Sequence, residues 1–230
     1  KLGRYSLNLG QTTYFAGSAG MFDGAELSYT SGKMSMLGGY ADSNAVNQAY
    51  TSSTFKDAGN IYYADMHYKF DDKVKANVFY VKNQSNDGVE ALVKVMGFGA
   101  TWQISNDWKF VGDYWKNSAD DAKLADGASP KGQVYRIAYK GAKAAVPGSW
   151  GAHLEYLKIE DGAVDGNWSG AAVPVTDGVK GWAFQYSNTL SKNVVADVIY
   201  AFNLKNAATG DDYYGGKGNK YTRFQINYMF

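Results

Sequence analysis

Apolar and polar side chains alternate along most of this chain, and a period of two residues is the signature of a β-strand. The end of the chain shows the pattern most clearly. Its two faces would carry Thr222, Phe224, Ile226, Tyr228 and Phe230 on one side and Tyr221, Arg223, Gln225, Asn227 and Met229 on the other. Because the same period recurs nearly everywhere, the chain is predicted to be all-β.

The polar face carries charge in the middle of strands. Asp65, His67 and Lys69 occupy one face of the segment that ends at Phe70. An unpaired charge in a dry core costs too much free energy to be tolerated. One face of the sheet is therefore predicted to be apolar and the opposite face to be wet.

The alternation divides the chain into strand-sized segments of about ten residues, the length that a tilted strand needs to cross a bilayer. The predicted strands are 1–10, 23–31, 33–42, 59–70, 73–83, 91–105, 108–117, 131–141, 149–160, 178–189, 193–203 and 219–230. The 19 Tyr, 27 Gly and 3 Pro fit strands joined by frequent hairpins.

The connections alternate between short and long. Short turns are predicted at Ser31-Gly32, Asp71-Asp72, Asn106-Asp107 and Ser191-Lys192, with a somewhat longer one at 142–148. Polar, Gly-rich links lie between them: 11–22, 43–58, 84–90, 118–130, 161–177 and 204–218. Tight turns at one end and long loops at the other are typical of a transmembrane up-and-down β-barrel. The whole range 1–230 is predicted to be one such domain.

Composition excludes several classes of protein. No run of about 18 apolar residues is present, so no transmembrane helix is expected. The absence of cysteine excludes disulfides and thiol chemistry, and a net charge of +1 argues against a nucleic-acid partner. No cofactor is expected.

Aromatic residues cluster at segment ends, which favours girdles at the membrane interfaces over ordinary core packing. The residues concerned are Tyr68, Phe70, Trp102, Trp108, Trp150, Tyr228 and Phe230. A last strand that ends on Phe230 resembles the C-terminal signature of outer-membrane barrels. That resemblance implies recognition by the barrel-insertion machinery.

A second resemblance lies near the start of the chain. Leu2-Gly3-Arg4, a Gly-rich loop and the run from Phe22 to Tyr29 resemble the middle of a trimeric general bacterial porin. More narrowly, this stretch of sequence resembles the S-layer-homology (OmpM-type) porins of diderm Firmicutes, and the resemblance covers their barrel region only. The resemblance implies a bacterial outer-membrane location, a homotrimer and a constriction loop that contains Tyr14, Phe15, Gly17 and Gly20. By composition alone, the same loop is a flexible, partly aromatic link.

The resemblance leaves two strand counts open. If residues 1–10 correspond to the fifth strand of a sixteen-stranded porin, the chain supplies the C-terminal twelve strands and four N-terminal strands are missing. A complete twelve-stranded barrel has an even strand count as well. We favour the first alternative, because the Gly-Arg motif is not expected at the beginning of a porin.

Alternation also predicts which charged residues face the lumen. The pore-lining set is Arg4, Glu26, Asp65, His67, Lys75, Asp113, Arg136, His153, Glu155, Asp197 and Arg223, with Lys33, Lys69, Lys73, Lys109, Lys140 and Lys180 nearer strand ends. Positive charges outnumber negative ones by about two to one, which predicts a mixed lumen with a positive bias. The lysines beside short turns are equally well explained as solvated interface residues.

A hydrolytic function receives little support. Catalysis by serine or cysteine hydrolases needs a nucleophile beside a base, usually His. His67 and His153 are the only histidines, and neither lies in a nucleophile motif. Two histidines also make a poor zinc site.

The favoured function is passive diffusion of small hydrophilic solutes and ions, without chemistry. The alternative is an outer-membrane anchor for a cell-wall-binding domain that would precede this chain. Membrane lipid is the expected partner in either case.

Overall fold

The computed structural model describes residues 1–12, 14–15, 22–42, 59–84, 91–164, 173, 175, 178–214 and 218–229. Within these ranges lie twelve β-strands and one 3₁₀ helix, η1 (Asp120–Ala122). The strands are β1 (Leu2–Tyr5), β2 (Phe22–Ser31), β3 (Met34–Asp42), β4 (Asn60–Lys69), β5 (Val74–Asn83), β6 (Lys94–Gln103), β7 (Trp108–Asn117), β8 (Lys131–Lys140), β9 (Trp150–Ile159), β10 (Val179–Ser191), β11 (Val194–Asn206) and β12 (Tyr221–Tyr228). No helix in these ranges has the length and hydropathy that a membrane span requires.

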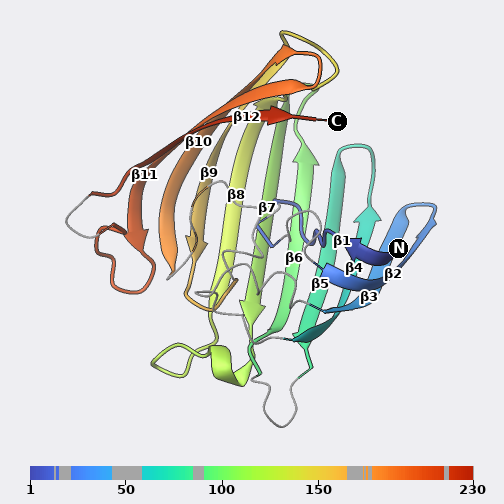
Figure 1. Ribbon diagram of the computed structural model, residues 1–230, viewed down its shortest axis with the longest axis vertical. Helices are drawn as coiled ribbons and strands as arrows, with labels where there is room; N and C mark the ends of the chain where they lie inside the picture. Colours follow the sequence, from blue (N-terminus) through green and yellow to red (C-terminus); the bar gives the residue numbers. More distant parts are fainter. Residues whose placement is uncertain are drawn as a thin grey trace.

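Every strand pairs antiparallel with its neighbour in the sequence. The hydrogen-bonded order runs from β1 to β12, which form the two ends of a single curved sheet (Figure 1). The short turns gather at the upper end of this view, and η1 lies at the lower end with the long connections. The predicted all-β, up-and-down architecture of twelve strands is confirmed.

The first strand is the main departure from the predicted boundaries. Residues 1–10 were expected to form a full strand, but β1 covers only Leu2–Tyr5. Gly3, within β1, has φ +98°, a backbone conformation that favours glycine. After Tyr5 the chain leaves the sheet and runs against the inner face of the wall, as its contacts with β4 to β9 show below.

The two faces of the sheet differ as the alternation predicts. On β4, Tyr62 and Met66 point outward and are 48% and 44% exposed. Ile61, Tyr63 and Asp65 point inward and are buried. The apolar outward face predicted for a membrane barrel is therefore present.

Aromatic side chains crowd the outward face at the short-turn end. Trp108 and Tyr139 have ring centroids 4.8 Å apart, Tyr139 and Trp150 are 5.5 Å apart, and Trp150 and Tyr186 are 6.0 Å apart. These rings form a row across β7 to β10, which we call the aromatic row. It agrees with the predicted placement of aromatics at strand ends.

The inward face is not wet along its whole height. Near the long loops it carries buried apolar side chains, which we call the apolar cluster: Phe22, Ile61, Phe79, Val81, Val95, Trp115, Leu157, Ile159, Val179 and Leu204, with Leu7, Leu9 and Phe15 from the start of the chain. The prediction of a fully wet inner face is wrong in this half. The sequence pattern could not show that residues 6–12 and 14–15 fold inward and cover these positions.

Two glycines make room for the largest rings of the apolar cluster. A Cβ at Gly97 would lie 2.3 Å from the Phe79 ring, and one at Gly132 would lie 2.1 Å from the Trp115 ring. Each ring therefore lies flat against the neighbouring strand. The Trp115 indole also donates a hydrogen bond to the Ala163 carbonyl at 2.8 Å, which joins the wall to the β9–β10 connection.

Candidate pore-lining site

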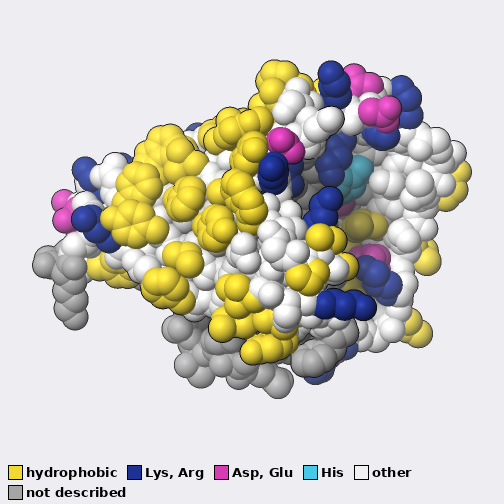
Figure 2. All heavy atoms as spheres, turned by 90° about the horizontal axis from the view of Figure 1, so that it is seen from above, with side chains coloured by type: hydrophobic (Ala, Val, Ile, Leu, Met, Phe, Trp, Pro, Cys, Tyr) yellow, Lys and Arg dark blue, Asp and Glu magenta, His cyan; other side chains and the backbone are white. Residues whose placement is uncertain are grey.

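Charged side chains occupy inward positions between the apolar cluster and the short turns. We call this set the charged belt: Glu26, Asp65, His67, Lys75, Lys109, Asp113, Arg136, His153, Glu155, Asp197 and Arg223. Figure 2 looks onto the short-turn end and shows a hollow in which basic side chains and a histidine are visible, with acidic side chains beside them. The five carboxylates of the belt are all buried.

The segment after β1 supplies the donors that hold Asp113. We call residues 6–12 and 14–15 the inward segment. The Gln11 amide donates to both Asp113 oxygens at 2.9 and 2.8 Å. The Thr12 amide and hydroxyl each donate to Oδ2 at 2.6 Å. A carboxylate with this many donors fixes the position of the chain that offers them.

Space for the Asp113 carboxylate depends on two glycines. A Cβ at Gly99 would lie 2.0 Å from Asp113 Oδ1, and one at Gly10, where φ is +79°, would lie 2.9 Å from Oδ2. Gly99 neighbours Asp113 in the register of β6 and β7. The Gly-Phe-Gly run of β6 thus serves packing on the inner face.

The Gln11 side chain bridges three strands. Its amide nitrogen donates to Asn77 Oδ1 at 2.9 Å and lies 3.3 Å from His67 Nδ1. Its amide oxygen accepts from the Thr101 hydroxyl at 3.0 Å. The opposite ring nitrogen of His67 lies 3.1 Å from Asp65. The inward segment is therefore attached to β4, β5 and β6 as well as to β7.

A second attachment lies at Glu155 on β9. The Tyr14 hydroxyl donates to Oε1 of Glu155, while Arg136 binds Oε2 through Nε at 2.8 Å and Nη2 at 2.7 Å. His153 Nε2 lies 3.7 Å from the same oxygen. Burial of the phenol, followed by the charge of Glu155, raises the pKa of Tyr14 well above its usual range. Tyr14 is therefore a neutral hydrogen-bond donor under all ordinary conditions.

The Asp197 carboxylate is held by side chains of the neighbouring wall strands. Asp197 accepts hydrogen bonds from Ser187 at 2.5 Å and from Asn227 at 2.5 Å, and lies 3.3 Å from the Gln185 amide. These partners come from β10 and β12, so the contacts tie the last three strands together.

Glu26 lies near the other end of the sheet. Its Oε1 pairs with Lys1 Nζ at 2.8 Å, and the Tyr63 hydroxyl lies 3.1 Å from Oε2. All five carboxylates of the belt thus have a basic group or a donor beside them.

The cations of the charged belt have fewer partners than its carboxylates. Arg136 is paired, but Lys75, Lys109 and Arg223 form no ion pair with any residue that the structure describes. All three are exposed on the inner side. These three cations therefore present their charge at the inner surface, whereas the belt carboxylates are buried.

Arg4 does not join the charged belt. Its guanidinium binds Asp23 at 2.8 and 2.7 Å on the side opposite the buried Tyr5 and Phe22. The sequence placed Arg4 inward because alternation was continued through the short strand β1. Of the predicted constriction-loop residues, Tyr14 and Phe15 lie in the inward segment and are buried, whereas Gly17 and Gly20 lie outside the described residues.

Sequence reasoning missed Gln11, Thr12 and Asn77 as members of the site. They are uncharged, so a search for lumen charges passed over them. Asn77 could have been found, because it continues the inward parity of Lys75 along β5. Gln11 and Thr12 lie in a connection, where no periodicity assigns a face.

Across the described ranges, no group of three or more His, Asp or Glu side chains is arranged to hold a metal ion. The imidazole rings of His67 and His153 contact Asp65, Gln11 and Glu155. What the arrangement can do is present fixed charges to water and narrow the interior with a tethered segment.

Comparison with solved structures agrees with the fold. OccK8 (OprE) of Pseudomonas aeruginosa superposes with a TM-score of 0.56 at 13% sequence identity, over 96% of this chain and 65% of that one. OpdQ of the same organism gives a TM-score of 0.52 at 13% identity, over 90% of this chain and 66% of that one. This chain spans about two thirds of the length of either protein. The chain therefore shares the fold of these two proteins.

Sequence comparison adds nothing to this result. No known family profile matches the chain, and no curated protein matches it significantly.

Proposed function

We propose that this chain forms the wall of a passive channel in the bacterial outer membrane for small hydrophilic solutes and ions. The observation that carries the proposal is the pairing of an apolar outward face with a charged belt on the inward face. Water on the inner side stabilises such a belt, and lipid on the outer side stabilises the apolar face. The porin-like fold supports the same assignment.

The inward segment is the constriction in this proposal. It is bound to Asp113 and Glu155, so it narrows the interior at a fixed position. Because the belt carboxylates are engaged while Lys75, Lys109 and Arg223 are not, the channel is expected to favour anions over cations. A narrow channel of this kind is predicted to conduct in small steps.

The experiment is conductance across a planar bilayer into which the complete native protein has been inserted. Steady unitary steps and a reversal potential of anion-selective sign in a salt gradient are expected. Complete absence of steps from protein that migrates as a folded barrel would refute the channel.

One observation favours the second candidate, an outer-membrane anchor in which permeation is incidental. The apolar cluster fills the inner face near the long loops, where a wide channel would need water. An anchor would insert and fold but would not conduct. A cell-wall-binding domain encoded before this segment in the native gene would support it, and would also support the S-layer-homology resemblance.

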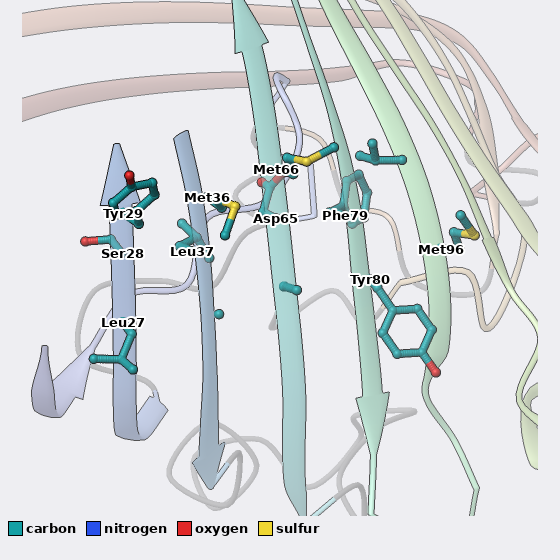
Figure 3. A pocket seen from close by; sticks show the side chains of 13 residues that line it. Leu27, Ser28, Tyr29, Met36, Leu37, Asp65, Met66, Phe79, Tyr80 and Met96 are labelled. Carbon is teal, nitrogen blue, oxygen red and sulfur yellow. The ribbon is translucent and has the colours of Figure 1, made fainter. Parts of the chain in front are cut away.

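A homotrimer is also proposed, with its contact on the outward face of β2 to β6. A shallow hollow of about 750 Å³ lies there, with Gly38 and Ala64 between the larger side chains of Leu27, Met36, Met66 and Tyr80, which Figure 3 shows on adjacent strands. Gly38→Leu is expected to dissociate the trimer in a cross-linking assay. Ala196→Leu, on the outward face of β11, is the matched control.

Two further points belong to the same proposal. Phe230, proposed as the signal for the insertion machinery, lies outside the described residues, and deleting it should slow assembly in cells.

His67 and His153 are proposed to have no catalytic role. Replacing both with Gln should leave any lipid or peptide hydrolysis by the purified protein unchanged.

A further inference from the structure

The connection between β8 and β9 differs from the other short turns. Residues 141–149 fold back on themselves through hydrogen bonds from Val146 N to the Lys143 carbonyl at 2.8 Å, Ser149 N to the Val146 carbonyl at 3.1 Å and Lys143 N to the Ser149 hydroxyl at 2.8 Å. Gly148 N also donates to the Thr189 carbonyl at 2.7 Å. The connection is therefore a fixed structure, and a ligand there would not need to order it.

A cleft of about 650 Å³ lies between this connection and the β6–β7 turn. Its lining includes Lys109, Lys140 and Lys143, with Asp107 as the single carboxylate. None of the three lysines has an ion pair with a residue in the described ranges. Three cations around one preformed cleft favour a ligand with more than one negative charge, or with a concentrated charge.

Lys140 places the cleft at the level of the membrane interface. Strand parity assigns Lys140 to the inner face, but its φ is +53°. Its ammonium lies over the outward rings of Tyr139 and Trp150, 5.2 and 5.5 Å from their centroids. Both rings belong to the aromatic row, and such rows mark the headgroup region of a bilayer. The positive φ therefore accounts for a lysine at the rim and not in the lumen.

We propose that this cleft binds the headgroup phosphate of an anionic phospholipid. Lys140 and Lys143 would contact the phosphate, Lys109 would approach from the inner side, and the acyl chains would lie along the apolar face below the aromatic row. A free oxyanion offers the same phosphate chemistry. The lipid is preferred because Lys140 rests on rings that face outward, where a solute in the lumen does not pass. The proposal depends on membrane insertion but not on permeation.

The test is native mass spectrometry of the full chain released from vesicles of equal phosphatidylglycerol and phosphatidylcholine. The wild type is expected to retain phosphatidylglycerol. Lys140→Gln combined with Lys143→Gln should lower that retention about thirtyfold, because two lysines at roughly 1 kcal/mol each near a charged surface amount to about 2 kcal/mol. Lys140→Arg should retain it, because guanidinium keeps both the charge and the stacking. The matched control is Lys73→Gln combined with Lys192→Gln, two exposed lysines on other short turns.

Equal loss in both double variants, or no loss in either, would overturn the site. Displacement of the lipid by excess inorganic phosphate, with phosphate retained in its place, would overturn the lipid as occupant. Heat-dependent gel migration reports folding of each variant separately. Because the proposal depends on membrane insertion, a failure of the folded wild type to insert into vesicles would overturn the lipid site, whereas insertion without conductance would overturn only the channel.

Discussion

The two halves of the interior are built from the same strands but differ in chemistry. Toward the long loops, Trp115 and Phe79 lie against glycines and pack with Phe15 of the inward segment in a dry apolar cluster. Toward the short turns, the same strands present the charged belt. A single β-strand such as β7 carries both, because Trp115 and Asp113 are neighbours on one face. The inward segment separates the two halves. It covers the apolar cluster and is bound by the charged belt.

This difference shows that alternation fixes the direction of a side chain but not its surroundings. A buried Trp and a buried Asp occupy equivalent inward positions two residues apart. Their energetics differ, since the ring gains from removal of apolar surface from water, whereas the carboxylate requires donors to replace water. The two halves should therefore respond differently to substitution.

The largest effect is expected in the dry half. Trp115→Ala removes a ring that is fully buried and should lower the free energy of unfolding by about 3–5 kcal/mol. Urea unfolding of protein folded in vesicles measures this. Ion selectivity should not change, because no charge is altered. A shift in reversal potential without a loss of stability would contradict the assignment of Trp115 to the dry half.

The next effect is expected at the attachment of the inward segment. Asp113→Asn keeps the size of the side chain but replaces an acceptor with a donor beside the Gln11 and Thr12 amides. Stability should fall by about 2–3 kcal/mol, the range for hydrogen bonds to a charged group. Unitary conductance should rise as the segment is released, and bilayer recordings measure it. Asp120→Asn, which makes the same change of charge at an exposed position outside the strands, serves as the control, and an equal rise in that variant would contradict the assignment.

A smaller effect is expected at Tyr14, where the two halves meet. Tyr14→Phe should cost about 1–2 kcal/mol below pH 10, because Glu155 loses a donor. The folded-state pKa of Tyr14 is raised above its unfolded value, so the folded protein holds the proton more tightly. The advantage of the wild type is thus complete below the unfolded pKa and declines as the pH rises above it. Parallel unfolding curves at pH 8 and pH 11 would show the gap closing, and a constant gap would exclude the raised pKa.

The smallest effect on stability is expected in the wet half. Lys75→Glu should change the free energy of unfolding by no more than about 0.5 kcal/mol, because the ammonium is exposed and makes no ion pair in the described part of the chain. The reversal potential in a salt gradient should nevertheless shift toward cation selectivity. Lys123→Glu, outside the strands, supplies the control for net charge. Equal shifts in both variants would show that Lys75 does not face the conducting path.

Strand positions and the outward face were predictable from the sequence because period and turn chemistry are local properties. The inward parity of Asp65, Asp113, Glu155 and Asp197 follows from the same pattern. The inward segment was not predictable from periodicity, since Leu7 and Leu9 alternate as a lipid-facing strand would, and only the contacts with Asp113 and Glu155 show the change of course. Arg4 was misplaced for the same reason.

The Gly97-Phe98-Gly99 run illustrates a second limit. Its role in making room for Phe79 and Asp113 depends on partners from β5 and β7. Such pairings become visible only when the register of the strands is known.

The most direct test uses the absence of cysteine from the chain. Lys75→Cys and Val81→Cys place single thiols at inward positions of β5, one in the charged belt and one in the apolar cluster. A water-soluble, charged thiol reagent added to a bilayer recording should change the current through the Lys75→Cys channel and leave the Val81→Cys channel unchanged. If neither variant responds, or if the thiol at residue 81 reacts as readily as the one at 75, the account of a water-filled, charged half beside a dry half is wrong.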